Sequence, residues 1–187
     1  KYPQPEKIGF RIIGCGKIGS MVAKKCVHGF DMKAVGYDPF VPVEARLPEI
    51  EYVDTMEEVF RRADFVSLHV PATKDNAGFV NKDPLSLMKP TAYLLNAARG
   101  TIVNEADLYE ALRSGRIGGA GLDVYAQEPP AADNPLFTLP NITVTPHNAS
   151  LTYVTTDRMG LHAAQGIGEV LSGGTPTWPC VTPKNPR

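Results

Sequence analysis

Short apolar segments alternate with helical patterns along almost the whole chain, and this alternation restricts the fold more than any other feature. We expect strands at residues 8–13, 33–38, 65–70, 91–96, 118–124 and 142–145. Strands that are separated by helices pair in parallel through right-handed crossovers. The sequence therefore predicts the α/β class, with a doubly wound parallel sheet of the Rossmann type.

Five helices are expected between and after these strands. The first covers residues 17–30, where Ile18, Met21, Val22 and Cys26 form one apolar stripe. The others are a helix that Asp54 caps and that ends at Arg62, a short helix at 84–88, a helix between Asn104 and Gly115, and a long helix at 151–172.

Composition excludes several functional classes. The 187 residues carry a net charge of −1, so no basic surface for nucleic acid or anionic lipid is expected. No apolar segment approaches the roughly 20 residues of a membrane span. Three scattered cysteines predict neither a disulfide framework nor a metal site, and they suit a reducing, cytoplasmic setting. We expect residues 1–174 to form one domain and the proline-rich residues 175–187 to form an extended arm.

A glycine motif follows the first expected strand and opens the first helix. Gly14, Gly16 and Gly19 have the G-x-G-x-x-G spacing that marks dinucleotide-binding turns in this context. The first glycine permits the tight turn, the second lets the backbone approach a pyrophosphate, and the third lets the helix lie close to the sheet. The alternative is an ordinary glycine-rich turn.

Asp38 stands at the end of the second expected strand, nineteen positions after Gly19. A carboxylate at this point accepts hydrogen bonds from the ribose hydroxyls and repels a 2′-phosphate, which favours NAD over NADP. The alternative is that Asp38 and Pro39 only start a turn. With the glycine motif in register, the sequence predicts an NAD site.

Three polar residues follow later strands: Arg99, Glu128 and His147. The carboxyl ends of parallel strands share one edge, where ligands of such sheets bind. A guanidinium can hold a substrate carboxylate, an imidazole can exchange a proton, and a neighbouring carboxylate can fix the imidazole tautomer. Taken singly, the three could instead be a carbonyl cap, a solvated loop acid and a turn histidine.

Four segments resemble consecutive signatures of the D-isomer-specific 2-hydroxyacid dehydrogenases. They are SLHVPAT at 67–73, NAARG at 96–100, GLDVYAQEPP at 121–130 and TPHNAS at 145–150, in matching order and spacing. The resemblance implies that Arg99 binds the substrate carboxylate, that His147 is the general acid/base and that Glu128 pairs with it. It also implies cofactor contacts from Lys17 and Ile18 at the pyrophosphate, Val70 and Pro71 at the adenosine, Ala97 and Ala98 beside the nicotinamide, and Asp123 at its carboxamide.

The same resemblance implies a second, substrate-binding domain that is largely missing from this chain. We therefore expect the cofactor domain of an NAD-dependent dehydrogenase for phosphoglycerate- or hydroxypyruvate-type acids, with little turnover by the chain alone. The family also implies a homodimer. Two alternatives stay open at this stage: a non-enzymatic module that senses NAD(H), and, with less support, another Rossmann enzyme that uses NAD transiently. No metal is expected, because the remaining histidines lack ligand spacing.

Overall fold

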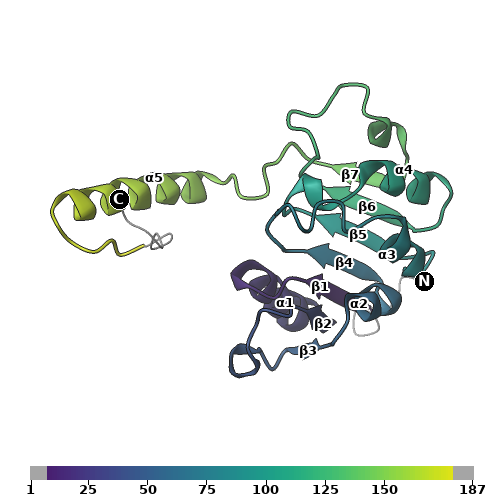
Figure 1. Cartoon of the computed structure of the whole chain (residues 1–187), viewed down its shortest axis with the longest axis horizontal. Helices are drawn as coiled ribbons and strands as arrows, with labels where there is room; N and C mark the ends of the chain where they lie inside the picture. The colour runs from purple at the N-terminus through teal and green to yellow at the C-terminus, as the bar shows by residue number, and fades with distance from the viewer. Residues whose placement is uncertain (1–7, 179–187) are drawn as a thin grey trace. The chain divides into compact units, whose positions relative to one another are not determined.

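A computed structural model describes residues 8–178 and contains a seven-stranded sheet (Figure 1). All strand pairs are parallel, and the order is β3-β2-β1-β4-β5-β6-β7. The strands are β1 (Gly9–Ile13), β2 (Lys33–Tyr37), β3 (Ile50–Tyr52), β4 (Phe65–Leu68), β5 (Tyr93–Asn96), β6 (Gly119–Leu122) and β7 (Ile142–Val144). The predicted α/β class and parallel sheet are confirmed.

Residues 8–178 also contain five helices, of which the first four belong to the same unit as the sheet. They are α1 (Lys17–Phe30), α2 (Met56–Arg62), α3 (Lys82–Leu87), α4 (Glu105–Arg113) and α5 (Tyr153–Leu171), with the short 3₁₀ turns η2 (Val43–Ala45), η3 (Gly100–Ile102) and η4 (Pro135–Thr138). The larger apolar cluster joins α2, α3 and α4 to the sheet and includes the fully buried Phe60, Leu94 and Leu108. A smaller cluster, with Ile12 and Ala23, lies beneath α1.

The strand order reverses beside β1, and this reversal positions the site. Ile13 at the end of β1 is in register with Tyr37 of β2 on one side and with Leu68 of β4 on the other. The connections after β1 and β4 leave toward opposite faces of the sheet, so a crevice opens at their carboxyl ends. The glycine turn begins directly after Ile13.

Two local predictions need correction. Thr55, and not Asp54, caps α2: its hydroxyl accepts a hydrogen bond from the Glu58 N–H at 3.4 Å, and its backbone is still extended where the helix begins. Strand β3 was not predicted, because three residues with a charged Glu51 at the centre are too short to show a strand pattern. Elsewhere the expected helices and strands occur within about two residues of the expected bounds, and α3 begins two residues earlier than expected.

The chain divides into two compact units, residues 1–147 and 148–187. Helix α5 lies in the second unit and contains no buried residue. The sequence places the boundary after residue 174 instead, and that boundary stays a prediction. Most of the expected arm, residues 179–187, lies outside the described residues, as do residues 1–7. Within residues 8–178, no helix combines the length and apolar character that crossing a bilayer requires.

Candidate functional site

The glycine turn has the geometry that a bound pyrophosphate needs. Gly14 has a φ of 92°, and a Cβ there would lie 2.6 Å from the carbonyl oxygen of His69. A Cβ on Gly19 would lie 2.0 Å from the carbonyl oxygen of Gly14. At Gly16, which precedes α1, a Cβ would meet open space, and no side chain caps the helix. The first N–H groups of α1 are thus available to an anion, and the residues fit a dinucleotide.

Asp38 connects the glycine turn to the end of β2. Its Oδ2 accepts the N–H of Cys15 at 2.8 Å, and its Oδ1 accepts the N–H of Phe40 at 2.9 Å. The carboxylate therefore organises the local turn, as the turn alternative expected. Beside it is a cavity of about 150 Å³ whose lining includes Met56 and Val70.

Cys15 is the one thiol inside the glycine turn, and it is packed rather than reactive. Its side chain is 3% exposed. Burial, and then the neighbouring Asp38 carboxylate, raise the pKa of the Cys15 thiol to about 12. A thiol in this state is not a nucleophile at neutral pH.

A second cavity of about 330 Å³ lies at the ends of β4 and β5. Seven residues that were expected to contact the cofactor line this cavity, and so do Arg99 and His69. The seven are Gly16, Lys17, Ile18, Val70, Pro71, Ala97 and Ala98. Asn96 shapes the turn after β5, because its side chain accepts the Ala98 N–H and donates to the Arg99 carbonyl. The exposed Arg99 guanidinium donates a hydrogen bond to the Ala98 carbonyl at 2.6 Å. This contact is of the kind expected if Arg99 only capped a local carbonyl.

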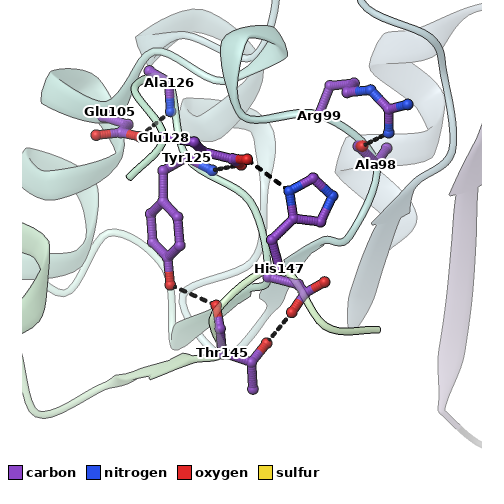
Figure 2. A network of polar contacts seen from close by, with 9 residues as sticks. Ala98, Arg99, Glu105, Tyr125, Ala126, Glu128, Thr145 and His147 are labelled. Atoms are coloured by element: carbon purple, nitrogen blue, oxygen red, sulfur yellow. Dashed lines mark hydrogen bonds and ion pairs between the residues drawn. The ribbon is translucent and has the colours of Figure 1, made fainter. Parts of the chain in front are cut away.

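Glu128 and His147 form a close pair after β6 and β7 (Figure 2). Glu128 Oε2 lies 2.6 Å from His147 Nδ1, and Glu128 Oε1 accepts the Tyr125 N–H at 3.0 Å. The Tyr125 N–H, then His147 and, more weakly, Arg99, lower the pKa of the Glu128 carboxyl. An ionised Glu128 favours a proton on Nδ1 and therefore an unprotonated Nε2 in the neutral imidazole. His147 itself has a φ of 52°, in the left-handed region.

Asp123, the residue expected at the nicotinamide carboxamide, is buried and 6% exposed. It accepts the Thr145 hydroxyl at 2.5 Å, while the Tyr125 hydroxyl donates to the Thr145 carbonyl at 2.9 Å. Asp123 therefore holds β7 against β6. Sequence reasoning missed Tyr125 although it lies inside a recognised motif, and it missed Glu105, for which no sequence signal exists.

A parallel sheet whose order reverses beside a glycine turn, with an acidic residue ending β2, defines the class of dinucleotide-binding α/β domains. The family model described as D-isomer specific 2-hydroxyacid dehydrogenase, NAD binding domain, matches residues 4–149. The chain belongs to this family.

Individual relatives agree with the family. The chain is 42% identical over 163 residues to a D-3-phosphoglycerate dehydrogenase of Methanocaldococcus jannaschii, covering 87% of this chain and 31% of that protein. It is 40% identical over 167 residues to a glyoxylate reductase of Thermofilum pendens, covering 88% and 49%. The D-lactate dehydrogenase of Lactobacillus jensenii, solved with NAD⁺, superimposes with a TM-score of 0.88 at 30% identity, covering 97% and 58%. The chain thus spans about a third of the length of the phosphoglycerate dehydrogenase, about half of the glyoxylate reductase and just over half of the D-lactate dehydrogenase.

These comparisons confirm the recognised family and NAD as its cofactor. They support the dehydrogenase hypothesis and give no support to the sensor alternative. The portion that the solved D-lactate dehydrogenase has and this chain lacks agrees with the expected missing substrate domain. Among residues 8–178, no three His, Cys, Asp or Glu side chains are grouped so that they could hold a metal ion.

Proposed function

We propose that this chain is the cofactor-binding part of an NAD-dependent dehydrogenase that interconverts D-2-hydroxy acids and 2-keto acids. The observation that carries the proposal is the Glu128–His147 pair, at 2.6 Å, on the same sheet edge as Arg99 and the glycine turn. A carboxylate-oriented imidazole beside a guanidinium is the equipment that keto-acid reduction needs.

Each residue then has a separate task. Arg99 binds the substrate carboxylate, His147 Nε2 gives a proton to the keto oxygen during reduction and removes it during oxidation, and Glu128 stabilises the protonated imidazole. NAD(H), when bound, supplies or accepts the hydride at the substrate carbon. The glycine turn would hold the pyrophosphate in the middle of the cofactor, Asp38 would hold its adenosine ribose, and Ala97 and Ala98 would border its nicotinamide ring.

The substrate class we favour is a small phosphoglycerate- or hydroxypyruvate-type acid. The names of two relatives, D-3-phosphoglycerate dehydrogenase and glyoxylate reductase, support a small 2-hydroxy or 2-keto acid. We further propose a homodimer in the cytoplasm, with no nucleic-acid or membrane partner. The free thiols of Cys15 and Cys26 and the net charge of −1 are in keeping with that setting.

The first experiment measures NADH binding by the 187-residue chain. We expect saturable fluorescence enhancement, because the glycine turn, Asp38 and both cavities lie within this chain. We expect very little turnover of hydroxypyruvate, since positioning of the substrate needs a closed cleft. Absence of NADH binding would sink the cofactor assignment, and full-rate turnover would show that no further domain is needed.

The second experiment replaces His147 with alanine in the complete protein. Loss of general acid catalysis should lower kcat by about 10²–10⁴-fold with little change in NADH affinity. His28→Ala is a matched control, because His28 also pairs with a glutamate, Glu49 at 3.3 Å, but lies in the last turn of α1 and outside the site. Equal activity of the two variants would contradict the proposed role of His147.

A further inference from the structure

The peptide unit between Tyr125 and Ala126 is held by a residue outside all recognised motifs. Glu105, the first residue of α4, accepts the Ala126 N–H through Oε1 at 2.6 Å (Figure 2). Its Oε2 accepts the Asn134 side-chain amide at 3.1 Å. One carboxylate therefore fastens two points of the loop between β6 and β7, and this loop carries Glu128.

Gly100 contacts the same peptide unit from a second direction. A Cβ on Gly100 would lie 1.8 Å from the carbonyl carbon of Tyr125 and 1.9 Å from its oxygen. Only a glycine permits this approach. Gly100 directly follows Arg99. The segment from Arg99 to Glu105 therefore contacts the loop near both ends of the segment, through Gly100 and through Glu105.

The Tyr125–Ala126 peptide is next to the Tyr125 N–H, which is the hydrogen-bond donor that orients Glu128. The Tyr125 N–H points to Glu128 Oε1 at 3.0 Å, and the next N–H along the chain is the one that Glu105 accepts. The Tyr125 hydroxyl reaches the carbonyl of Thr145, two residues before His147. The Tyr125 N–H belongs to the preceding peptide unit, so a rotation of the Tyr125–Ala126 peptide would shift Tyr125 and, with it, the contact to Glu128 and then His147.

We propose that Glu105 is a positioning residue for the Glu128–His147 pair, acting through the Tyr125–Ala126 peptide. The inference rests on the proposed function for its effect on catalysis, but its structural effect on Glu128 can be measured without any reaction. Glu105 touches neither substrate nor cofactor in this scheme. It fixes the loop on which the carboxylate stands, and so the direction in which the imidazole presents its proton.

Three variants separate positioning from simple stabilisation. Glu105→Ala removes both hydrogen bonds, and Glu105→Asp keeps the charge at the start of α4 but withdraws the carboxylate by one methylene. Asp107→Ala is the matched control, because Asp107 lies in the same first helical turn and accepts a backbone N–H, that of Lys82 at 3.0 Å, away from the loop. If Glu105→Ala does not fold, Glu105→Asp carries the test.

The first readout is the titration of the Glu128 carboxyl by NMR in the 187-residue chain. The Tyr125 N–H is the largest cause of its lowered pKa, so misdirecting that donor should move the Glu128 pKa upward toward 4.5 in both Glu105 variants. Asp107→Ala should leave the Glu128 titration unchanged. Unchanged Glu128 titration in the folded Glu105 variants would overturn the proposal.

The second readout is steady-state kinetics of the complete protein. Misplacement of the pair should lower kcat about tenfold or more with an unchanged KM for NADH, since small displacements of catalytic groups cost this much. Asp107→Ala should keep the wild-type kcat. A Glu105 variant with shifted Glu128 titration but wild-type kcat would refute the catalytic role proposed for the pair while leaving the positioning contact intact, so the two failures are distinguishable.

Discussion

His69 lies at the end of β4, where the glycine turn, α1 and the adjoining cavity meet. Its Nε2 is 2.9 Å from the Ser67 hydroxyl, and its backbone N–H donates to the Ile13 carbonyl. Burial lowers the pKa of the His69 imidazole, so the folded chain disfavours its protonated form. At this position a neutral imidazole supports the turn without adding charge.

This lowered pKa predicts a pH-dependent stability. Between the unfolded value near 6.5 and the lower folded value, the unfolded chain binds the proton more readily, so the free energy of unfolding falls as pH falls through this window. His69→Gln should remove this component and flatten the profile between pH 7 and pH 5. Urea denaturation at closely spaced pH values measures it.

The comparison variant is His28→Gln, which changes an exposed histidine in the last turn of α1. A wild-type profile that rises as pH falls from 7 to 5, relative to His69→Gln, would contradict the assignment, because it would mean that folding favours the protonated imidazole.

At the scale of elements, the contact between α1 and the end of β1 depends on one glycine. A Cβ on Gly19 would lie 2.0 Å from the Gly14 carbonyl oxygen. Because this oxygen belongs to the backbone, no side-chain rotation can relieve the clash. Gly19→Ala should therefore push α1 away from β1 and lower the free energy of unfolding by about 1–3 kcal/mol. It should also weaken NADH binding, because the first N–H groups of α1 move with the helix.

Gly29 offers a matched control within the same helix. A Cβ at Gly29 would meet nothing within 4 Å, and alanine is the better helix former by about 1 kcal/mol. Gly29→Ala should be neutral or stabilising, with unchanged NADH affinity. If denaturation and fluorescence titration found Gly19→Ala equal to Gly29→Ala, the close packing of α1 on the turn would not be a requirement.

These elements also show what sequence reasoning can reach. Helix α4 was predicted because Asn104 is a good cap, and its side chain does accept the N–H groups of Ala106 and Asp107. The glycine turn was predicted because a steric demand at Gly14 and Gly19 leaves a fixed spacing in the sequence. Local chemistry of this kind is visible in the residue order, whereas the three-residue β3 is held by pairing with β2 and leaves no pattern of its own.

In the candidate site, too, some features could be predicted from residue order and others depend on the three-dimensional arrangement of the loops. Arg99, Glu128 and His147 could be placed at one edge because parallel topology brings strand ends together. The hydrogen bond from the Ala126 N–H to Glu105 joins residues 21 positions apart in the sequence. It depends on the geometry of the loop, and no rule of residue spacing predicts it. Likewise, the hydrogen bond from Tyr125 to Thr145 depends on how β6 and β7 are staggered rather than on residue type.

At the scale of the whole molecule, the described core belongs to the first unit. Among residues 8–178, every buried apolar residue lies between Phe10 and Leu136, and α5 contains no buried residue. Several large apolar side chains of α5 are strongly exposed, including Tyr153 at 94% and Leu171 at 82%. Burial of apolar surface is the main source of stability, so the first unit contains a core of its own.

A chain that ends after Ser150 tests this distribution. We expect residues 1–150 to fold cooperatively by themselves, because the described core lies between Phe10 and Leu136. NADH affinity should also be unchanged, because the glycine turn and both cavities remain. Phe60→Ala in the full chain calibrates the assay, since emptying a fully buried position costs about 3–5 kcal/mol. A chain of residues 1–150 that shows no cooperative unfolding would contradict this placement of the core.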